Sequence, residues 1–120
     1  MHAVIFEVQP KSGAIDDYLN IAASLKIELE KIDGFISVER FQSMVNADKL
    51  VSLSFWRDEQ AIQDWRSQTK HQEAQSEGYK QIFETYRIRV AEVVRDYSMT
   101  DRCLLYTSDA ADEGLGVDLG

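Results

Sequence analysis

Hydrophobic and polar residues alternate over four short segments of the chain, a pattern typical of β-strands. The segments are rich in β-branched and aromatic residues and comprise residues 3–8, 36–42, 50–56 and 88–97. In the third segment, one face carries Val51, Leu53 and Phe55, and the other carries Leu50, Ser52, Ser54 and Trp56. The alternation therefore predicts four strands, each with two distinguishable faces.

Between the first and second strands, apolar residues recur at steps of three and four, which predicts one helix with a single apolar face. The residues of this face are Ile15, Tyr18, Leu19, Ala22, Leu25, Leu29 and Ile32. Gly34 is expected to end the helix in the left-handed cap conformation, with Phe35 supplying the hydrophobic contact that follows such a cap.

A second helix is expected between the third and fourth strands. Asp58 is a favourable N-cap, and Ile62 and Trp65 fall on one side of the helix that follows. Gly78 marks a break, after which helical spacing returns over residues 79–86. The last strand is then expected over residues 88–97.

The order strand, helix, strand, strand, helix, strand predicts an α+β fold of the ferredoxin-like βαββαβ type. In this fold both helices lie on one face of a four-stranded antiparallel sheet. The other face keeps apolar side chains that one chain cannot cover, so we expect a homodimer with its sheets face to face.

Residues 103–120 depart from the pattern of the preceding chain. Cys103-Leu104-Leu105-Tyr106-Thr107-Ser108 resembles the in-frame translation of a transposase sequencing-adapter end, TGT CTC TTA TAC ACA TCT. We expect residues 1–102 to form one domain and residues 103–120 to be a disordered, non-native tail that takes no part in the fold.

Charge and composition exclude several classes of function. The formal net charge is −8; without the tail, 21 acidic residues become 17 against 13 basic ones, a net charge of −4. An acidic chain is unsuited to binding the negatively charged backbone of a nucleic acid. No segment has the length of a membrane span or the features of a signal peptide, so we expect a cytoplasmic protein. The single cysteine, Cys103, lies in the tail and supports neither a disulfide nor a cysteine metal site.

Two sequence blocks resemble the antibiotic biosynthesis monooxygenase (ABM) family. They are DGFISVERF at residues 33–41 and LSFWRDEQAIQDW at residues 53–65, with His71 beyond them, and the resemblance extends from about Val4 to Tyr97. It implies a dimeric α/β barrel built from ferredoxin-like subunits. It also implies insertion of oxygen from O₂ into a small aromatic or quinol substrate, with no bound metal, flavin or other cofactor.

Four residues are the predicted site. His71 is the expected catalytic base, since histidine titrates near neutrality and a deprotonated phenol-like substrate is electron-rich enough to react with O₂. Trp56, Trp65 and Tyr86 are expected to bind the substrate. Each also has a structural interpretation: a core or interface ring for the aromatic residues, and an exposed position on a polar helix for His71.

Two other functions remain open. The domain is alternatively a non-catalytic dimeric module for small-ligand binding or assembly. Heme degradation is a further alternative, because Trp65 matches the helical tryptophan of heme-degrading relatives. Those relatives also use a first-strand asparagine and a histidine about three turns beyond the tryptophan, where this chain has Glu7 and Gln75.

The first three predicted strands contain three charged residues, Glu7, Glu39 and Arg40. Charges on a sheet are usually solvated or paired across strands. A charge enclosed by the fold is costly unless it is paired, and it then marks a functional site.

Overall fold

The computed structural model describes residues 1–75 and 79–100, and for residues 69–75, 79 and 80 it describes the backbone alone. It contains β1 (His2–Pro10), α1 (Ile15–Leu29), β2 (Phe35–Gln42), β3 (Leu50–Trp56), α2 (Glu59–Gln75), α3 (Tyr79–Ile82) and β4 (Phe83–Glu92). The predicted βαββαβ order is confirmed, with α3 as a short addition before β4.

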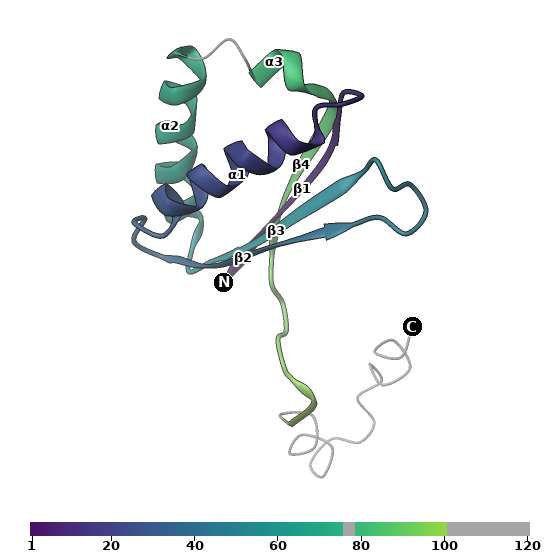
Figure 1. Ribbon diagram of the computed structural model, residues 1–120. Helices are drawn as coiled ribbons and strands as arrows, with labels where there is room; N and C mark the ends of the chain where they lie inside the picture. The colour runs from purple at the N-terminus through teal and green to yellow at the C-terminus, as the bar shows by residue number, and fades with distance from the viewer. Residues whose placement is uncertain (76–78, 101–120) are drawn as a thin grey trace.

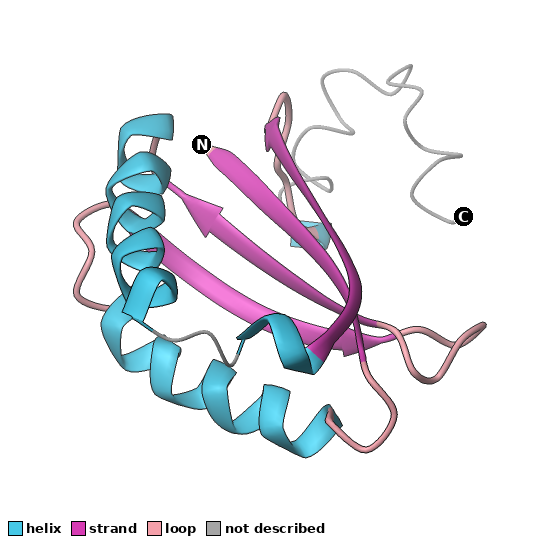
Figure 2. Cartoon of the chain, turned by 90° about the horizontal axis from the view of Figure 1, so that it is seen from above, coloured by secondary structure: helices cyan, strands magenta, loops and turns pink. Residues whose placement is uncertain are grey.

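The four strands form one antiparallel sheet in the order β2-β3-β1-β4. All three helices lie on the same side of this sheet (Figures 1 and 2). We call this the helix side and the opposite surface the open face. Because side chains alternate along a strand, Val4, Phe6 and Val8 of β1 face the helices, whereas Ile5 and Glu7 face away. The predicted faces of β3 are confirmed.

Two hydrophobic clusters join the helices to the sheet. One contains Val8, Tyr18, Ala22 and Leu50, packed by Phe6, Ile15, Ile82 and Phe83. The other, which we call the tryptophan cluster, contains Leu29, Trp56, Ala61 and Ile62, packed by Val4, Ile32, Phe35, Val38 and Trp65. The first cluster therefore lies beneath the start of α1 and α3, and the tryptophan cluster beneath the end of α1 and the start of α2.

The first helix ends earlier than its apolar pattern predicts. α1 stops at Leu29 with Glu30 as its C-cap, and Ile32 lies in the following turn. Gly34 does adopt the left-handed conformation, with φ of 95°, but in the turn that enters β2 rather than at the helix cap. A Cβ atom at Gly34 would lie 2.8 Å from the Cβ of Ala61, so glycine also permits the close approach of α2.

The faces of β2 differ from simple alternation at its first residues. The register with β3 shifts between Phe35 and Ser37, so Ile36 is the extra residue of a bulge. Alternation alone would place Phe35 on the face opposite Val38, but its ring packs against Trp56 on the helix side, with centroids 5.3 Å apart. Ile36 is instead 53% exposed. Burial of Phe35 in the tryptophan cluster is the physical reason for the shift.

The last strand begins earlier than predicted. The helical spacing over residues 79–86 yields only the single turn α3, because β4 starts at Phe83 and pairs with β1 from Pro10 onward. Pairing with the sheet satisfies a row of backbone hydrogen bonds that a short isolated helix lacks. The strand ends at Glu92 rather than at residue 97, and the segment beyond it leaves the sheet (Figure 1).

Some predictions lie outside the described residues, namely the break at Gly78 and the non-native tail at residues 103–120. The homodimer also stays a prediction. Within the described part of the chain, no helix combines the length and apolar character that crossing a bilayer requires.

Candidate functional site

The structure brings together two of the predicted substrate-binding residues, Trp56 and Trp65. Both belong to the tryptophan cluster, Trp56 from the end of β3 and Trp65 from α2. Trp56 is only 1% exposed, and its Nε1 donates a hydrogen bond of 2.9 Å to the hydroxyl oxygen of Ser54. Trp56 therefore serves as a core residue here, and substrate contact by either indole stays a prediction.

The predicted base, His71, lies on α2, and its side chain is outside the described residues. Its catalytic role therefore stays a prediction. The start of α2 is well defined: the Asp58 carboxylate accepts a 3.0 Å hydrogen bond from the backbone N–H of Ala61, as predicted for an N-cap. This bond, followed by the one from the Arg57 guanidinium, lowers the pKa of Asp58.

Tyr86 lies apart from the two tryptophans, on the helix side of β4. Its ring centroid is 5.7 Å from that of Phe6 and 5.9 Å from that of Phe83. Phe83 in turn lies 6.2 Å from Phe6 and 5.8 Å from Tyr18. These four residues, which we call the aromatic cluster, meet edge to face, an arrangement that aromatic rings favour. The cluster joins β1, β4 and the first turn of α1.

One border of the aromatic cluster is open to solvent. Tyr86, Ile88 and Val90 occupy alternate positions of β4, point to the helix side and are 59%, 56% and 50% exposed. We call these three residues the β4 strip. A contiguous exposed apolar surface of this kind is a candidate contact surface for a hydrophobic partner or ligand.

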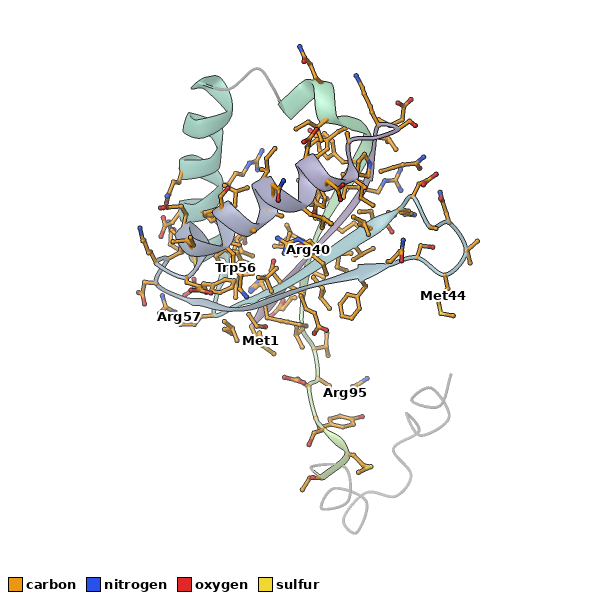
Figure 3. The ribbon with its side chains drawn as sticks, in the orientation of Figure 1. Met1, Arg40, Met44, Trp56, Arg57 and Arg95 are labelled. Atoms are coloured by element: carbon orange, nitrogen blue, oxygen red, sulfur yellow. The ribbon has the colours of Figure 1, made fainter. Side chains whose placement is uncertain are left out.

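A charged residue, Arg40, faces the same side of the sheet from β2. Figure 3 shows Arg40 between α1 and the strands. Its Nη2 donates a long hydrogen bond of 3.5 Å to the carbonyl oxygen of Ala22, and its buried Nε has no hydrogen-bond partner among the described residues. Burial raises the pKa of Tyr18, whereas a hydrogen bond between its hydroxyl and Arg40 acts in the opposite direction. Arg40 thus adds a positive charge to one end of the first core cluster.

Glu7, in contrast, lies on the open face and is neutralised within the chain. Its carboxylate oxygens lie 3.2 Å from Arg89 Nη1 and 3.7 Å from Lys49 Nζ. The hydrogen bond from Arg89 is the main cause of a lowered pKa of Glu7. Glu7 therefore has a structural partner and does not face the helices.

Arg40 is one of the charged strand residues noted in the sequence, but it is not among the four predicted site residues. The signal that could have selected it is its alternation with Val38, which places both on the covered face of the sheet.

The structure also bears on metal binding. Among the residues that it describes, no group of three or more histidine, cysteine or acidic side chains lies close enough together to hold a metal ion.

Comparison with known proteins identifies the family. The family model described as antibiotic biosynthesis monooxygenase matches residues 1–77. The chain belongs to this family. The resemblance carried by the DGFISVERF and LSFWRDEQAIQDW blocks is therefore confirmed.

A curated relative in Pyricularia oryzae, named jasmonate monooxygenase ABM, is 40% identical over 113 residues, which cover 94% of this chain and 53% of the relative. The present chain thus spans about half the length of that relative.

Solved structures confirm the fold. Rv0793 from Mycobacterium tuberculosis superposes with a TM-score of 0.68 at 16% identity, covering 81% of this chain and 98% of its own. SnoaB from Streptomyces nogalater, described as a cofactor-independent oxygenase, superposes with a TM-score of 0.65 at 11% identity, covering 79% and 94%. Both share the architecture of this ABM domain.

Proposed function

We propose that this chain is a monooxygenase that oxidises a small hydrophobic substrate with O₂. The observation that carries the proposal is its 40% identity, over nearly its whole length, to a protein named as a monooxygenase. The expected substrates are small aromatic compounds or quinols, and the jasmonate of the relative's name adds a non-aromatic candidate.

The helix side of the sheet supports this function. The β4 strip and the adjoining rings of Phe6 and Tyr86 offer an apolar surface for the body of the substrate. Trp65 and His71 belong to α2, which covers the other half of the same side. In the proposed reaction, His71 accepts a proton from the substrate, and the resulting carbanion or phenolate reacts with O₂.

The two substrate classes differ in their electron balance. An anthrone-type methylene supplies all four electrons: R₂CH₂ and O₂ give R₂C=O and H₂O, with one oxygen atom in the carbonyl and one in water. Hydroxylation of a saturated carbon of a jasmonate needs two further electrons and two protons to form R–OH and H₂O. That reaction therefore requires an added donor, such as a reduced nicotinamide.

An oxygen electrode tests the proposal with the full chain. Anthrone, a hydroquinone and jasmonate are each assayed with and without a reduced nicotinamide, and products are identified by mass spectrometry after ¹⁸O₂ labelling. We expect turnover with at least one substrate and its loss by about 100-fold or more in His71→Ala. Gln72→Ala, the neighbouring substitution on α2, is the matched control and retains the activity.

Two outcomes distinguish the reaction from the residue assigned to it. Absence of oxygen uptake and of labelled product with every substrate would overturn the monooxygenase proposal and favour the non-catalytic binding module. Equal rates for His71→Ala and the unsubstituted chain would remove His71 from the mechanism while leaving the reaction in place.

We also propose that two copies of the chain associate through the open face. Ile5, Leu53 and Phe55 form its apolar centre, with Glu39 on the β2 edge and Arg87 on the β4 edge. A two-fold axis parallel to the strands places β2 of one copy over β4 of the other. Each acidic edge then meets a basic edge, so charge complementarity favours a second copy of this chain as the occupant.

Light scattering tests the dimer. We expect a dimeric mass for the unsubstituted chain and a monomeric mass for Leu53→Asp. Glu39→Arg and Arg87→Glu should each weaken the dimer, and the double swap should restore it. A monomeric unsubstituted chain, or a dimer unaffected by Leu53→Asp, would contradict the proposal.

A further inference from the structure

Arg40 carries a positive charge for which the described part of the chain supplies no counter-ion. A guanidinium is always charged in proteins and has five N–H donors. The described hydrogen bond of Arg40 is the 3.5 Å bond to the carbonyl oxygen of Ala22, and Arg40 also acts to lower the pKa of the Tyr18 hydroxyl. Its Nε is buried, and no described residue supplies a hydrogen-bond acceptor for it. Enclosing a charge with unmet hydrogen bonds costs free energy, so this arrangement indicates an acceptor that the described residues do not supply.

Two other arginines, unlike Arg40, form ion pairs with carboxylates of the chain. Arg57 pairs with Asp33 and Asp58, and Arg89 pairs with Glu7. No carboxylate among the described side chains lies within ion-pairing distance of Arg40. Arg40 is also only partly exposed, so water satisfies the guanidinium less completely than it does an exposed arginine.

The strand register connects this charge to the apolar surface. Arg40 pairs with Ser52, Ser52 with Phe6, and Phe6 with Ile88, so these four residues form one row across the helix side of β2, β3, β1 and β4. Adjacent strands lie about 4.8 Å apart, so the row spans roughly 14 Å. It begins with a cation, continues over the small side chain of Ser52, and ends on the exposed β4 strip.

Tyr18 provides a second connection between the charge and the rings. Arg40 acts to lower the pKa of its hydroxyl, against the effect of burial, and its ring lies 5.8 Å from Phe83 in the aromatic cluster. The hydroxyl can also donate a hydrogen bond to an oxygen atom that the guanidinium binds. Charge, hydroxyl and aromatic surface are therefore parts of one contiguous set of side chains.

We infer that Arg40 binds an anionic oxygen of the substrate, with the hydrophobic body of the substrate lying along the row toward Phe6 and Ile88. The inference rests on the proposed function and narrows its substrate class to hydrophobic molecules that carry a carboxylate or a phenolate. Arg40 acts as a binding residue with charge-assisted hydrogen bonds. The catalytic step is still assigned to the residue that removes the substrate proton, proposed above to be His71.

Calorimetric titration of the full chain with matched ligands tests this inference. 1-Naphthaleneacetate is compared with its methyl ester, and 2-naphthol with 2-methoxynaphthalene. We expect the chain to bind the anion at least tenfold more tightly than the neutral analogue in one pair. A carboxylate shows this preference at every pH from 6 to 9, whereas for the naphthol it grows as the pH rises toward the phenol pKa, ordinarily about 10.

Substitution of Arg40 supplies the decisive control. In Arg40→Met, the preference for the anion should fall to about onefold while the affinity for the neutral analogue stays unchanged. Arg89→Met, the same change on the open face, should keep the preference. Urea unfolding of Arg40→Met should show no loss of stability, since the substitution removes a poorly satisfied charge.

Several results would overturn the inference: equal affinities for anion and neutral analogue, a preference that persists in Arg40→Met, or no binding of either pair. A large loss of stability in Arg40→Met would assign Arg40 a structural role instead. Binding requires no turnover, so a chain that binds the anion through Arg40 but consumes no oxygen would contradict the proposed reaction alone.

Discussion

Arg89 and Arg40 lie on opposite faces of the same sheet and differ in whether a carboxylate of the described chain neutralises their charge. On the open face, Arg89 is 3.2 Å from the Glu7 carboxylate, which Lys49 also approaches. On the helix side, Arg40 donates a long hydrogen bond to a carbonyl oxygen and acts on the pKa of Tyr18, and its Nε has no partner in the part of the chain that the structure describes. A charge balanced within the chain needs only a structural explanation, whereas the partly enclosed charge of Arg40 is the observation on which the proposed anion site rests.

The two faces also differ in how they are covered. On the helix side, Trp56 is 1% exposed, and its one polar atom is satisfied by Ser54. The adjacent residue, Phe55, points to the open face and is only partly buried. Two consecutive residues of one strand thus differ in burial, because side chains alternate along a strand and point to opposite faces of the sheet.

The largest expected effect comes from truncating these neighbours. Trp56→Ala should lower the free energy of unfolding by about 3–5 kcal/mol, because it removes a fully buried ring from a packed cluster. Phe55→Ala should cost about 1–2 kcal/mol at a concentration at which the chain is monomeric, because less apolar area is lost from the interior. Urea unfolding measures both values. Equal losses in the monomer would contradict the difference between the faces.

An intermediate effect is expected where α2 approaches the turn before β2. Gly34→Ala should destabilise the fold by about 2–4 kcal/mol, through strain at positive φ and overlap with Ala61. Gly13 also has positive φ, but a Cβ there would meet no described atom within 4 Å, so Gly13→Ala should cost only about 1–2 kcal/mol. Thermal and urea unfolding of both variants check this order, and a reversed order would show that α2 does not depend on the contact.

The smallest effect concerns the Glu7 ion pairs on the open face. The pKa of folded Glu7 lies below its ordinary value of 4.5, so its stabilising contribution is fully present above that value and is lost as the pH falls through the lowered pKa. Glu7→Gln should therefore be less stable than the unsubstituted chain at pH 7, and the difference should vanish in acid and shrink in high salt.

Unfolding curves from pH 7 to pH 3 measure this Glu7 effect. Glu84→Gln is the matched control, since Glu84 is exposed on β4 and no ion pair joins it to another described residue. A Glu7→Gln difference that is constant with pH would show that the ion pairs contribute nothing.

Much of the architecture could be predicted because its signals are local. Alternation identified β3 from Leu50 to Trp56 with both faces correct, and Asp58 predicted the start of α2. The local pattern gave wrong predictions where contacts between distant residues determine the structure. Phe35 faces the helix side because its ring packs against Trp56, which a bulge in β2 makes possible. The strand β4 starts at Phe83 because it pairs with β1 from there.

For the site, the sequence alone determined the residue types, the family blocks and the alternation that places Arg40 on the same face of its strand as Val38. Whether a charge has a counter-ion depends on which strands become neighbours, and periodicity within one strand carries no such information. The tertiary structure decided this by placing β1 between β3 and β4, so that Glu7 meets Arg89 and Lys49 on the open face. The same pairing left Arg40 on the helix side without a counter-ion among the described residues, in one row with Phe6 and Ile88.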